Sequence, residues 1–350
     1  MCGRATLLVF FLAGLAPADG KVMPPRDYKG SLEEKAQEAI IIFHGSEKPG
    51  DAVEDLILKI TVQGETKSFA WVVPFPNEPQ VQKADAKLFE ELYDYVQARR
   101  MRKKGKTRAG AVAGEKEELK SVDVLSRRVV GSFDVAVVRE NVAGSLNKWL
   151  AENGYQTLED AEDVLGFYRK KGYVFACIKV AGAALKAQQP ADIHPLRFTF
   201  KTGGRDGVFF PMKMTGLQKE RFDVNLYVFY RFWLNDRLSK YGYAHRGLRL
   251  KHRDWDTPEC KPNGGKAWTD PSGDVFLKPM ASKISAVTKL LQALHPGERY
   301  YLTNIYGSFG PDDVRSWNDD LWLFPYYTDK SMVPYDARPG GCAAAGWRSG

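Results

Sequence analysis

Side chains that can bind a metal ion are concentrated in one stretch of the chain. The candidate ligands are His245, His252, Asp254, Asp256, Glu259 and Cys260. Imidazole, carboxylate and thiolate groups all bind Zn²⁺, and carboxylates also bind Ca²⁺. The spacing matches neither a zinc finger nor a His-Glu-x-x-His helix, and the basic residues between the ligands would repel a cation. No motif predicts a cofactor, so zinc or calcium here is a hypothesis that competes with an ordinary charged loop.

Two pairs of adjacent carboxylates could serve acid–base chemistry. Asp312–Asp313 and Asp319–Asp320 supply the residue type that glycosidases use in pairs. His44 and His194 are isolated histidines without a sequence neighbour that would complete a catalytic triad. A metal-dependent or carboxylate-based hydrolase is therefore the alternative function, and acidic residues in ordinary loops explain the same pattern.

Aromatic residues are dense towards the C-terminal end of the chain. The segment from Tyr300 to Tyr327 includes Trp317, Trp322 and Tyr326. Exposed aromatic rings can stack on sugar rings or anchor a protein interface. Trp317, Trp322, Tyr326 and Tyr327 are therefore a candidate binding surface, and burial of these rings in a hydrophobic core is the competing interpretation.

The N-terminus has the form of a secretory signal peptide. Residues 1–18 begin with one arginine, continue through an apolar run and end with alanines that fit a cleavage site after Ala18. We therefore predict an exported protein, periplasmic or extracellular, with a buried N-terminal helix as the alternative. No later apolar run reaches the about 18 residues that a membrane-spanning helix needs, so no transmembrane segment is predicted in the mature chain.

Three cysteines follow the predicted cleavage site. Cys177 lies in an apolar, strand-like segment and is predicted to be a buried free thiol. Cys260 and Cys342 lie in segments rich in proline and glycine, and in an oxidising compartment they could form a disulfide. Sequence spacing does not show whether their Cα atoms are close enough, so a disulfide and two free thiols are both open.

The 350-residue chain carries 51 basic and 43 acidic residues, a formal net charge of +8. Seven of the basic residues fall between Arg99 and Arg108, and a stretch rich in glycine and alanine follows. We interpret residues 99–120 as a basic low-complexity linker or loop. Such a run can bind phosphates, but an exported protein rarely meets nucleic acid. We expect a solvated loop, and contact with an acidic polymer of the cell envelope is the alternative.

The hydrophobic pattern predicts an α+β fold, mainly an antiparallel sheet with inserted helices. A content of 44% hydrophobic and 27% charged residues excludes a wholly disordered chain. Strands at 39–43, 56–62 and 69–73, joined by short turns, indicate an antiparallel meander. The remaining predicted elements are a helix from Asp85 to about Arg102, a hairpin over 122–138, helices at 145–152, 158–171 and 285–294, and strands at 173–180, 196–201, 224–233, 300–306 and 320–324.

These elements suggest several blocks along the chain. The predicted organisation is a signal peptide at 1–18, a meander plus helix at 19–98, the linker at 99–120, an α+β block at 121–235, an aromatic-rich block at 236–330 and a flexible tail at 331–350. The blocks on the two sides of the linker are either separate domains or one domain with a long inserted loop, because strands of both could share a sheet.

The order of several segments resembles the bacterial family called domain of unknown function 2330. The segments that carry the resemblance are 34–42, 69–76, 131–138, 146–155, 172–180, 194–200, 301–306 and 319–321. Each is mainly hydrophobic, so their order is more specific than any one of them. The resemblance implies an exported envelope protein without an established activity, so no catalytic residue is carried over. Members often have a C-terminal membrane anchor, whereas the small residues at 340–346 are too few to span a bilayer.

The sequence therefore favours an exported envelope protein of unknown biochemical activity. The predicted role is non-enzymatic, as a binding or scaffold protein whose partner is an envelope protein or a polysaccharide. The hydrolase described above is the alternative.

Overall fold

The structure is a computed structural model, and it describes residues 20–29, 32–34, 36–46, 50–60, 62–63, 66, 68–100, 124–131, 133–181, 194–203, 207–230, 268–269, 284–296 and 300–323. Within these residues the strands form two large sheets and two small ones. The five-stranded sheet has the order β1 (Lys21–Met23), β6 (Ser68–Phe75), β10 (Val174–Ala181), β9 (Phe133–Arg139) and β8 (Val124–Val130). The seven-stranded sheet has the order β14 (Trp268–Thr269), β15 (Tyr301–Phe309), β13 (Phe222–Tyr230), β3 (Ala36–His44), β4 (Val53–Lys59), β11 (Leu196–Lys201) and β7 (Gln80–Lys83).

Short strands and helices complete the described part of the chain. The small sheets pair β12 (Val208–Phe210) with β16 (Leu321–Leu323), and β2 (Glu33–Glu34) with β5 (Val62–Gln63). The helices are α1 (Lys87–Arg100), α2 (Ser145–Glu152), α3 (Glu162–Lys171), the 3₁₀ helix η2 (Met214–Leu217), α5 (Ser285–Leu294) and α6 (Pro311–Arg315). Strands pair antiparallel except for β3 and β13, which are parallel. The fold is therefore α+β and mainly antiparallel, as predicted.

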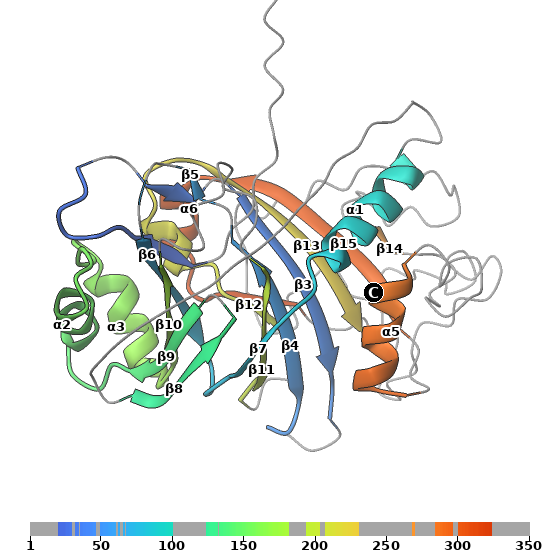
Figure 1. Cartoon of the computed structure of the whole chain (residues 1–350), viewed down its shortest axis with the longest axis horizontal. Helices are drawn as coiled ribbons and strands as arrows, with labels where there is room; N and C mark the ends of the chain where they lie inside the picture. Colours follow the sequence, from blue (N-terminus) through green and yellow to red (C-terminus); the bar gives the residue numbers. More distant parts are fainter. Residues whose placement is uncertain are drawn as a thin grey trace, which may run out of the picture.

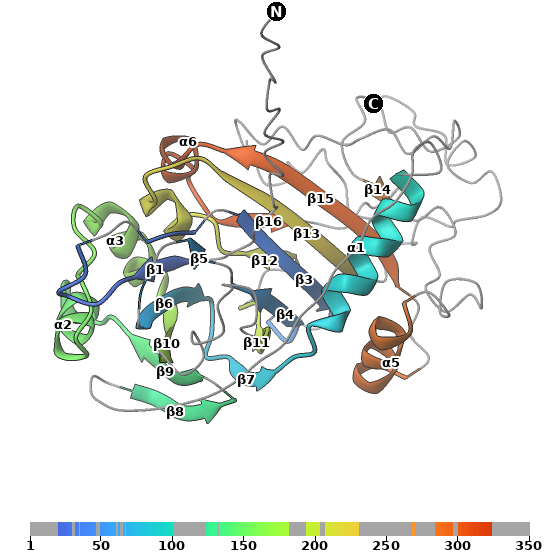
Figure 2. The same cartoon turned by 45° about the horizontal axis from the view of Figure 1, so that its top comes forward.

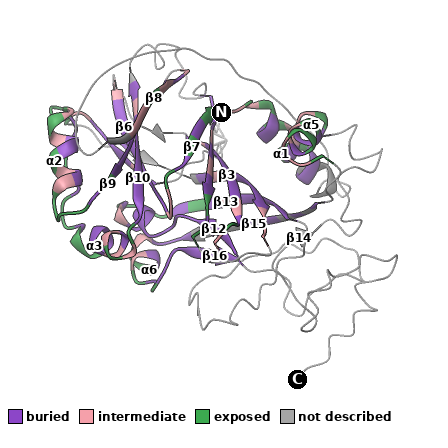
Figure 3. Ribbon diagram, turned by 90° about the horizontal axis from the view of Figure 1, so that it is seen from below, coloured by how far each residue is buried: buried purple, intermediate pink, exposed green. Residues whose placement is uncertain are grey.

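The two large sheets pack face to face between two pairs of helices. Helices α2 and α3 lie outside the five-stranded sheet, and α1 and α5 lie outside the seven-stranded sheet (Figures 1 and 2). Figure 3 shows buried residues on the helix sides that face the sheets and exposed residues on the outer sides. The inner face of each sheet packs against the other sheet, and helices cover part of each outer face, so central strands such as β6 are almost continuously apolar and buried.

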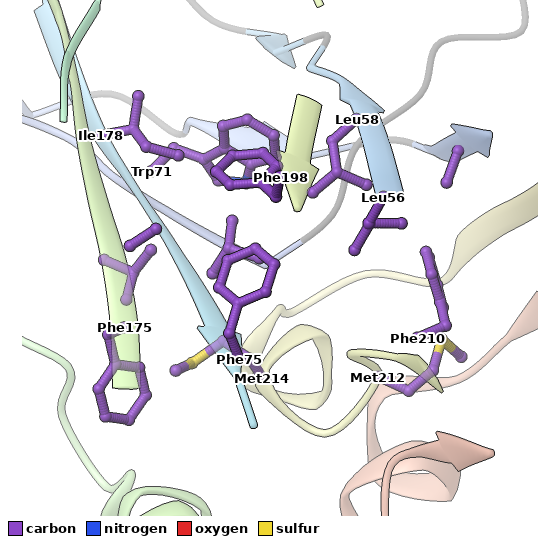
Figure 4. Packing of buried hydrophobic residues seen from close by; sticks show 14 of the residues in the cluster. Leu56, Leu58, Trp71, Phe75, Phe175, Ile178, Phe198, Phe210, Met212 and Met214 are labelled. Atoms are coloured by element: carbon purple, nitrogen blue, oxygen red, sulfur yellow. The ribbon is translucent and has the colours of Figure 1, made fainter. Parts of the chain in front are cut away.

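The core between the sheets is rich in aromatic side chains. Trp71 and Phe75 of β6 face Phe198 of β11, and the ring centroids of Phe75 and Phe198 are 4.9 Å apart (Figure 4). On the opposite side of the five-stranded sheet, Phe175 of β10 packs against Tyr168 of α3 at 5.7 Å. A smaller cluster joins the seven-stranded sheet to α1 and α5.

The predicted meander is wrong in its third strand. β3 and β4 are antiparallel neighbours, but β6, which contains residues 69–73, lies in the other sheet between β1 and β10. The free edge of β4 pairs instead with β11. The short turns predicted that β6 would pair with β4, the strand just before it in the sequence. It pairs instead with β10, which is distant in the sequence.

Strands from both sides of residues 99–120 share both large sheets. β6 pairs with β10, β3 pairs with β13, and β4 pairs with β11. The segments before and after residues 99–120 therefore contribute strands to the same sheets. In the described part of the chain, no helix is both long and apolar enough to cross a membrane.

Candidate functional site

A group of polar side chains lies on the helix-covered face of the seven-stranded sheet, and we call it the outer-face polar group. Its members are Glu38 of β3, Asn225 and Tyr227 of β13, and Asn304 of β15. Glu38 is the register partner of Asn225, and Tyr227 is the partner of Asn304. Asn225 and Tyr227 share a face because side chains alternate along a strand. Three neighbouring strands therefore fix the positions of all four side chains.

Hydrogen bonds link these four side chains. The amide nitrogen of Asn225 donates to Glu38 Oε1 at 3.2 Å and to the Tyr227 hydroxyl at 3.0 Å. The Tyr227 hydroxyl lies 3.4 Å from the same carboxylate oxygen, and Asn304 donates to Asn225 Oδ1 at 2.8 Å. The network holds Glu38 Oε1 in place, while no hydrogen bond to Oε2 is present among the described residues.

Burial raises the pKa of the Glu38 carboxyl group. The hydrogen bonds from Tyr227 and Asn225, and the charge of Lys59 on the neighbouring strand β4, act in the opposite direction but are outweighed. The Nζ atom of Lys59 lies 5.8 Å from the ring centroid of Phe89, so α1 borders the group. Glu38 is thus a positioned carboxyl group that remains half-buried rather than sealed in the core.

The outer-face polar group offers hydrogen-bond acceptors to a ligand. Asp223 is exposed and lies two positions before Asn225, which places its side chain on the same face of β13. Carboxylate oxygens accept hydrogen bonds from hydroxyl and ammonium groups. No sequence motif predicted this group, and the one signal for it was the presence of polar residues such as Glu38, Asn225 and Asn304 within otherwise apolar strands.

A second polar group surrounds His44, at the end of β3. Asp55 Oδ2 lies 3.4 Å from His44 Nε2, and the Tyr300 hydroxyl lies 3.2 Å from Nδ1. The ring of His295 stacks on the His44 ring with 3.5 Å between centroids, and Thr199 donates a hydrogen bond to Asp55. The fold thus supplies the partners of His44 that its sequence neighbours lack.

The arrangement around His44 is closed rather than open to a substrate. Both ring nitrogens face protein groups, and Tyr300 is 1% exposed. The Tyr300 hydroxyl can donate a hydrogen bond to Nδ1, whereas Nε2 lies near Asp55 without making a hydrogen bond among the described residues. A catalytic base needs a nitrogen directed at the substrate, so this group is best understood as a fixed contact between the sheet and the end of α5.

Asp320 is buried and has a structural role. Its Oδ1 accepts hydrogen bonds from the Tyr168 hydroxyl and from the backbone N–H groups of Met212 and Lys213, each at 2.9 Å. Burial raises the pKa of its carboxyl group to about 6. The residue therefore joins α3, the segment before η2 and the start of β16.

The other predicted carboxylates have separate surroundings. Asp319 accepts a hydrogen bond from Lys171 Nζ at 2.9 Å, whereas Asp312 and Asp313 are exposed in the first turn of α6. Asp319 and Asp320 therefore have different partners, and neither predicted pair forms a joint acid–base site in this structure.

The remaining predicted residues are buried or lie outside the described part of the chain. Trp317 and Trp322 are 6% and 1% exposed, so they fill the core. The prediction that these two rings form a binding surface is therefore wrong. Tyr326 and Tyr327 lie outside the described residues. Cys177 is a buried free thiol, as predicted. The metal candidates His245, His252, Asp254, Asp256, Glu259 and Cys260, and the disulfide candidates Cys260 and Cys342, also lie outside the described residues.

His194 is buried as well, against the edge of the Phe133 ring at 4.8 Å. Among the described residues, no group of three or more histidine, cysteine or acidic side chains is arranged to hold a metal ion.

Comparison with known proteins identifies a family. Residues 48–315 match the family described as "Uncharacterized protein conserved in bacteria (DUF2330)". No curated protein matches the chain. Among solved structures, the crystal structure of baculovirus P35 is similar with a TM-score of 0.35 and 14% sequence identity. That match covers 57% of this chain and 64% of the other, and a likeness at this level supports no argument about function.

Proposed function

The chain belongs to this family of uncharacterised bacterial proteins, and from that premise we propose that it is an exported cell-envelope protein that binds a hydroxyl-rich polysaccharide. The outer-face polar group is the binding site. The observation that carries the proposal is the Glu38 carboxyl group, which is half-buried and has one oxygen held by Asn225 and Tyr227.

This geometry suits recognition of a hydroxylated ligand. Glu38 Oε1 is fixed, and Oε2 is left to accept a hydrogen bond from a ligand hydroxyl. Asp223, on the same face, adds an exposed acceptor. Because the group sits on paired strands, little side-chain entropy is lost on binding, and this preorganisation favours affinity.

The positions of the predicted carboxylates favour binding over hydrolysis. Asp319 and Asp320 hold separate structural contacts, and the ring nitrogens of His44 face Asp55 and Tyr300. The metal-binding candidates between His245 and Cys260, on which the hydrolase alternative depends, lie outside the described residues, so the structure does not test them.

Export is supported by the N-terminal sequence. Residues 1–18 begin with one arginine, continue through an apolar run and end with small residues that fit a cleavage site after Ala18.

Binding by the chain from residue 19 to 350 tests the site. The change is Glu38→Gln, which removes the charge and keeps the shape, and the matched control is Glu159→Gln on the exposed connection before α3. A panel of purified envelope polysaccharides is screened by melting temperature, since a ligand at about 100 times its Kd adds about 2.7 kcal/mol of stability. We expect one polysaccharide to bind the unchanged protein. Its affinity for Glu38→Gln should be about tenfold weaker than for the unchanged protein, and its affinity for Glu159→Gln should be the same.

Two outcomes of this panel contradict the proposal. Equal binding by Glu38→Gln and the unchanged protein removes the outer-face polar group as the site. In a second set of samples, zinc is added with and without EDTA. A rise in melting temperature with zinc that EDTA reverses, accompanied by hydrolysis of the polysaccharide, favours the hydrolase alternative instead.

A further inference from the structure

The outer-face polar group lies beside a second carboxylate. Asp223 of β13 is exposed, and it precedes Asn225, the register partner of Glu38, by two positions. Neighbouring strands are about 4.8 Å apart and residues rise by about 3.3 Å along a strand, so the Cα atoms of Glu38 and Asp223 lie about 8 Å apart. Because both side chains project from the same face of the sheet, the two carboxyl groups can approach one ligand from two sides.

Neither carboxyl group is paired with a cation in the described part of the chain. Lys59 is the register partner of Glu38 on β4, but its Nζ atom lies over the ring of Phe89, 5.8 Å from the centroid. Among the described residues, neither Oε2 of Glu38 nor the carboxylate of Asp223 makes a hydrogen bond or an ion pair. Both are therefore left for a ligand.

The amide groups beside these carboxylates have no N–H left to offer. Asn225 donates to Glu38 and to the Tyr227 hydroxyl, and Asn304 donates to Asn225 Oδ1 and to the carbonyl oxygen of Leu226. Each side-chain amide has two N–H donors, so the donors of both amides are used inside the protein. The surface that faces a ligand thus presents acceptors, and these suit a ligand group that only donates.

Burial makes an unpaired charge on Glu38 unfavourable. The pKa of its carboxyl group is raised mainly because burial removes water from the charged form, and the charge of Lys59 and the hydrogen bonds from Tyr227 and Asn225 do not offset this effect. A positive charge placed beside Oε2 would favour the ionised form. A neutral hydroxyl group supplies a hydrogen bond without a charge, so it stabilises this carboxylate less.

We propose that the polysaccharide bound by the outer-face polar group carries free amino groups, and that one protonated amine is held between Glu38 Oε2 and Asp223. This inference rests on the proposed function, whose site it shares. A primary ammonium group has three N–H donors and no acceptor, so each carboxylate accepts one hydrogen bond while the third donor faces water or a sugar oxygen. The ligand thereby supplies the charge that Lys59 does not bring into contact.

An organic amine suits these residues better than a metal ion does. Ca²⁺ takes six to eight oxygen ligands. The described residues contain no group of three or more histidine, cysteine or acidic side chains arranged to hold a metal ion. Two carboxylates are enough for an ammonium group, because it is bound through two or three directed hydrogen bonds.

Two oligosaccharides that differ only in their nitrogen group test the inference. One is an oligomer of glucosamine, which has free amines, and the other is the N-acetylated oligomer of the same length and linkage. Titration calorimetry with the full chain measures both Kd values at a pH where the amine is protonated. We expect the affinity for the free-amine oligomer to be about tenfold higher, as for one added hydrogen bond between charged groups. The formal net charge of +8 repels a cationic oligomer, so nonspecific attraction would not produce this result.

Variants separate the charge from the rest of the site. Glu38→Gln keeps the oxygen that accepts from Asn225 and Tyr227, and it is expected to abolish most of the preference for the free amine. Asp223→Asn is expected to weaken binding of the free-amine oligomer about threefold, as for a partly exposed ion pair. Asp27→Asn, at an exposed position after β1, is the matched control and should change neither Kd. If Glu38→Gln lacks a melting transition, Asp223→Asn still decides, because its side chain is exposed.

The outcomes distinguish the inference from the proposal beneath it. Equal affinity for the two oligomers, with Glu38→Gln weakening both, overturns the amine and leaves the proposed site intact. Tighter binding of the N-acetylated oligomer also overturns the inference, because a neutral group is then preferred. If neither oligomer binds, the inference is overturned as well, and the polysaccharide panel decides the proposed function independently: that function stands where some other polysaccharide binds in a Glu38-dependent manner.

Discussion

Replacing Asp320 by asparagine is expected to remove the contribution of this one carboxyl group to the pH dependence of stability. Oδ1 of Asp320 accepts three hydrogen bonds, and Oδ2 is buried without a hydrogen-bond partner. Asparagine can keep the oxygen at Oδ1 and place its amide nitrogen at Oδ2. The substitution therefore removes the ionisation of the side chain while it retains the three accepted bonds.

The magnitude follows from the pKa of the Asp320 carboxyl group, which burial raises from 3.8 to about 6. Between pH 3.8 and about 6, the Asp320 side chain of the folded protein therefore holds a proton that the same side chain releases in the unfolded protein. The stabilisation is complete below pH 3.8 and is lost as the pH rises through about 6. The shift corresponds to about 3 kcal/mol between the two limits.

Urea unfolding between pH 4 and pH 7.5 measures this effect. The free energy of unfolding of Asp320→Asn, minus that of the unchanged protein, is expected to rise by about 2 kcal/mol over this range, because pH 4 lies just above the unfolded pKa of 3.8. Taking the difference cancels the other titrating groups. Asp320→Ala is the comparison, because it leaves Tyr168, Met212 and Lys213 without their acceptor and should cost about 3 kcal/mol or more at every pH.

Parallel stability curves for Asp320→Asn and the unchanged protein would refute this reasoning. So would a difference that falls as the pH rises, because it would mean that the folded state favours the ionised carboxylate.

Three further predictions concern the fold. Gly131→Ala should lose about 2–3 kcal/mol of stability in urea unfolding, because φ is +61° and the new Cβ would lie 2.1 Å from Nε2 of His194. Gly154→Ala, where φ is +81° and the space around the new Cβ is open, should lose only about 1 kcal/mol. Equal losses in the two variants would contradict the crowding at His194. Burial raises the pKa of the Cys177 thiol, so a thiol reagent should label this residue only in urea, and peptide mass spectrometry showing rapid native labelling would contradict its burial. Glu91→Ala should cost about 1 kcal/mol by removing the acceptor of two N–H groups in the first turn of α5, and an unchanged melting temperature would count against that cap.

Local patterns predicted many of the elements. The helix predicted at 285–294 and the strand predicted at 196–201 coincide with α5 and β11. In α5 the apolar residues recur at helical spacing, and His295 and Pro296 follow the last turn. α3 begins at Glu162 rather than at residue 158, because the preceding residues form turns before the helix starts. Such signals act over a few residues and need no knowledge of distant partners.

Pairing between distant segments could not be predicted in the same way. β6 is flanked by β1 and β10, and β10 lies about one hundred residues further along the chain. All these strands are apolar on both faces, so alternation did not indicate which sheet each would join. The predicted meander failed for this reason.

The candidate site could not be predicted from the sequence, because its residues lie on strands that are distant in the sequence. Glu38, Asn225 and Asn304 come from three strands and meet only through their register. His44 and His295 likewise stack although they are far apart in the sequence. The predicted tryptophans, Trp317 and Trp322, were clustered in sequence but are buried, because aromatic side chains contribute most when they fill a core.

Intact-mass spectrometry of the protein in separated cell fractions tests the central claim most directly. Export predicts that the envelope or extracellular fraction holds a chain that begins at Asp19, while the cytoplasm holds at most a trace of the precursor. A full-length chain that begins at Met1 and remains in the cytoplasm would contradict the account.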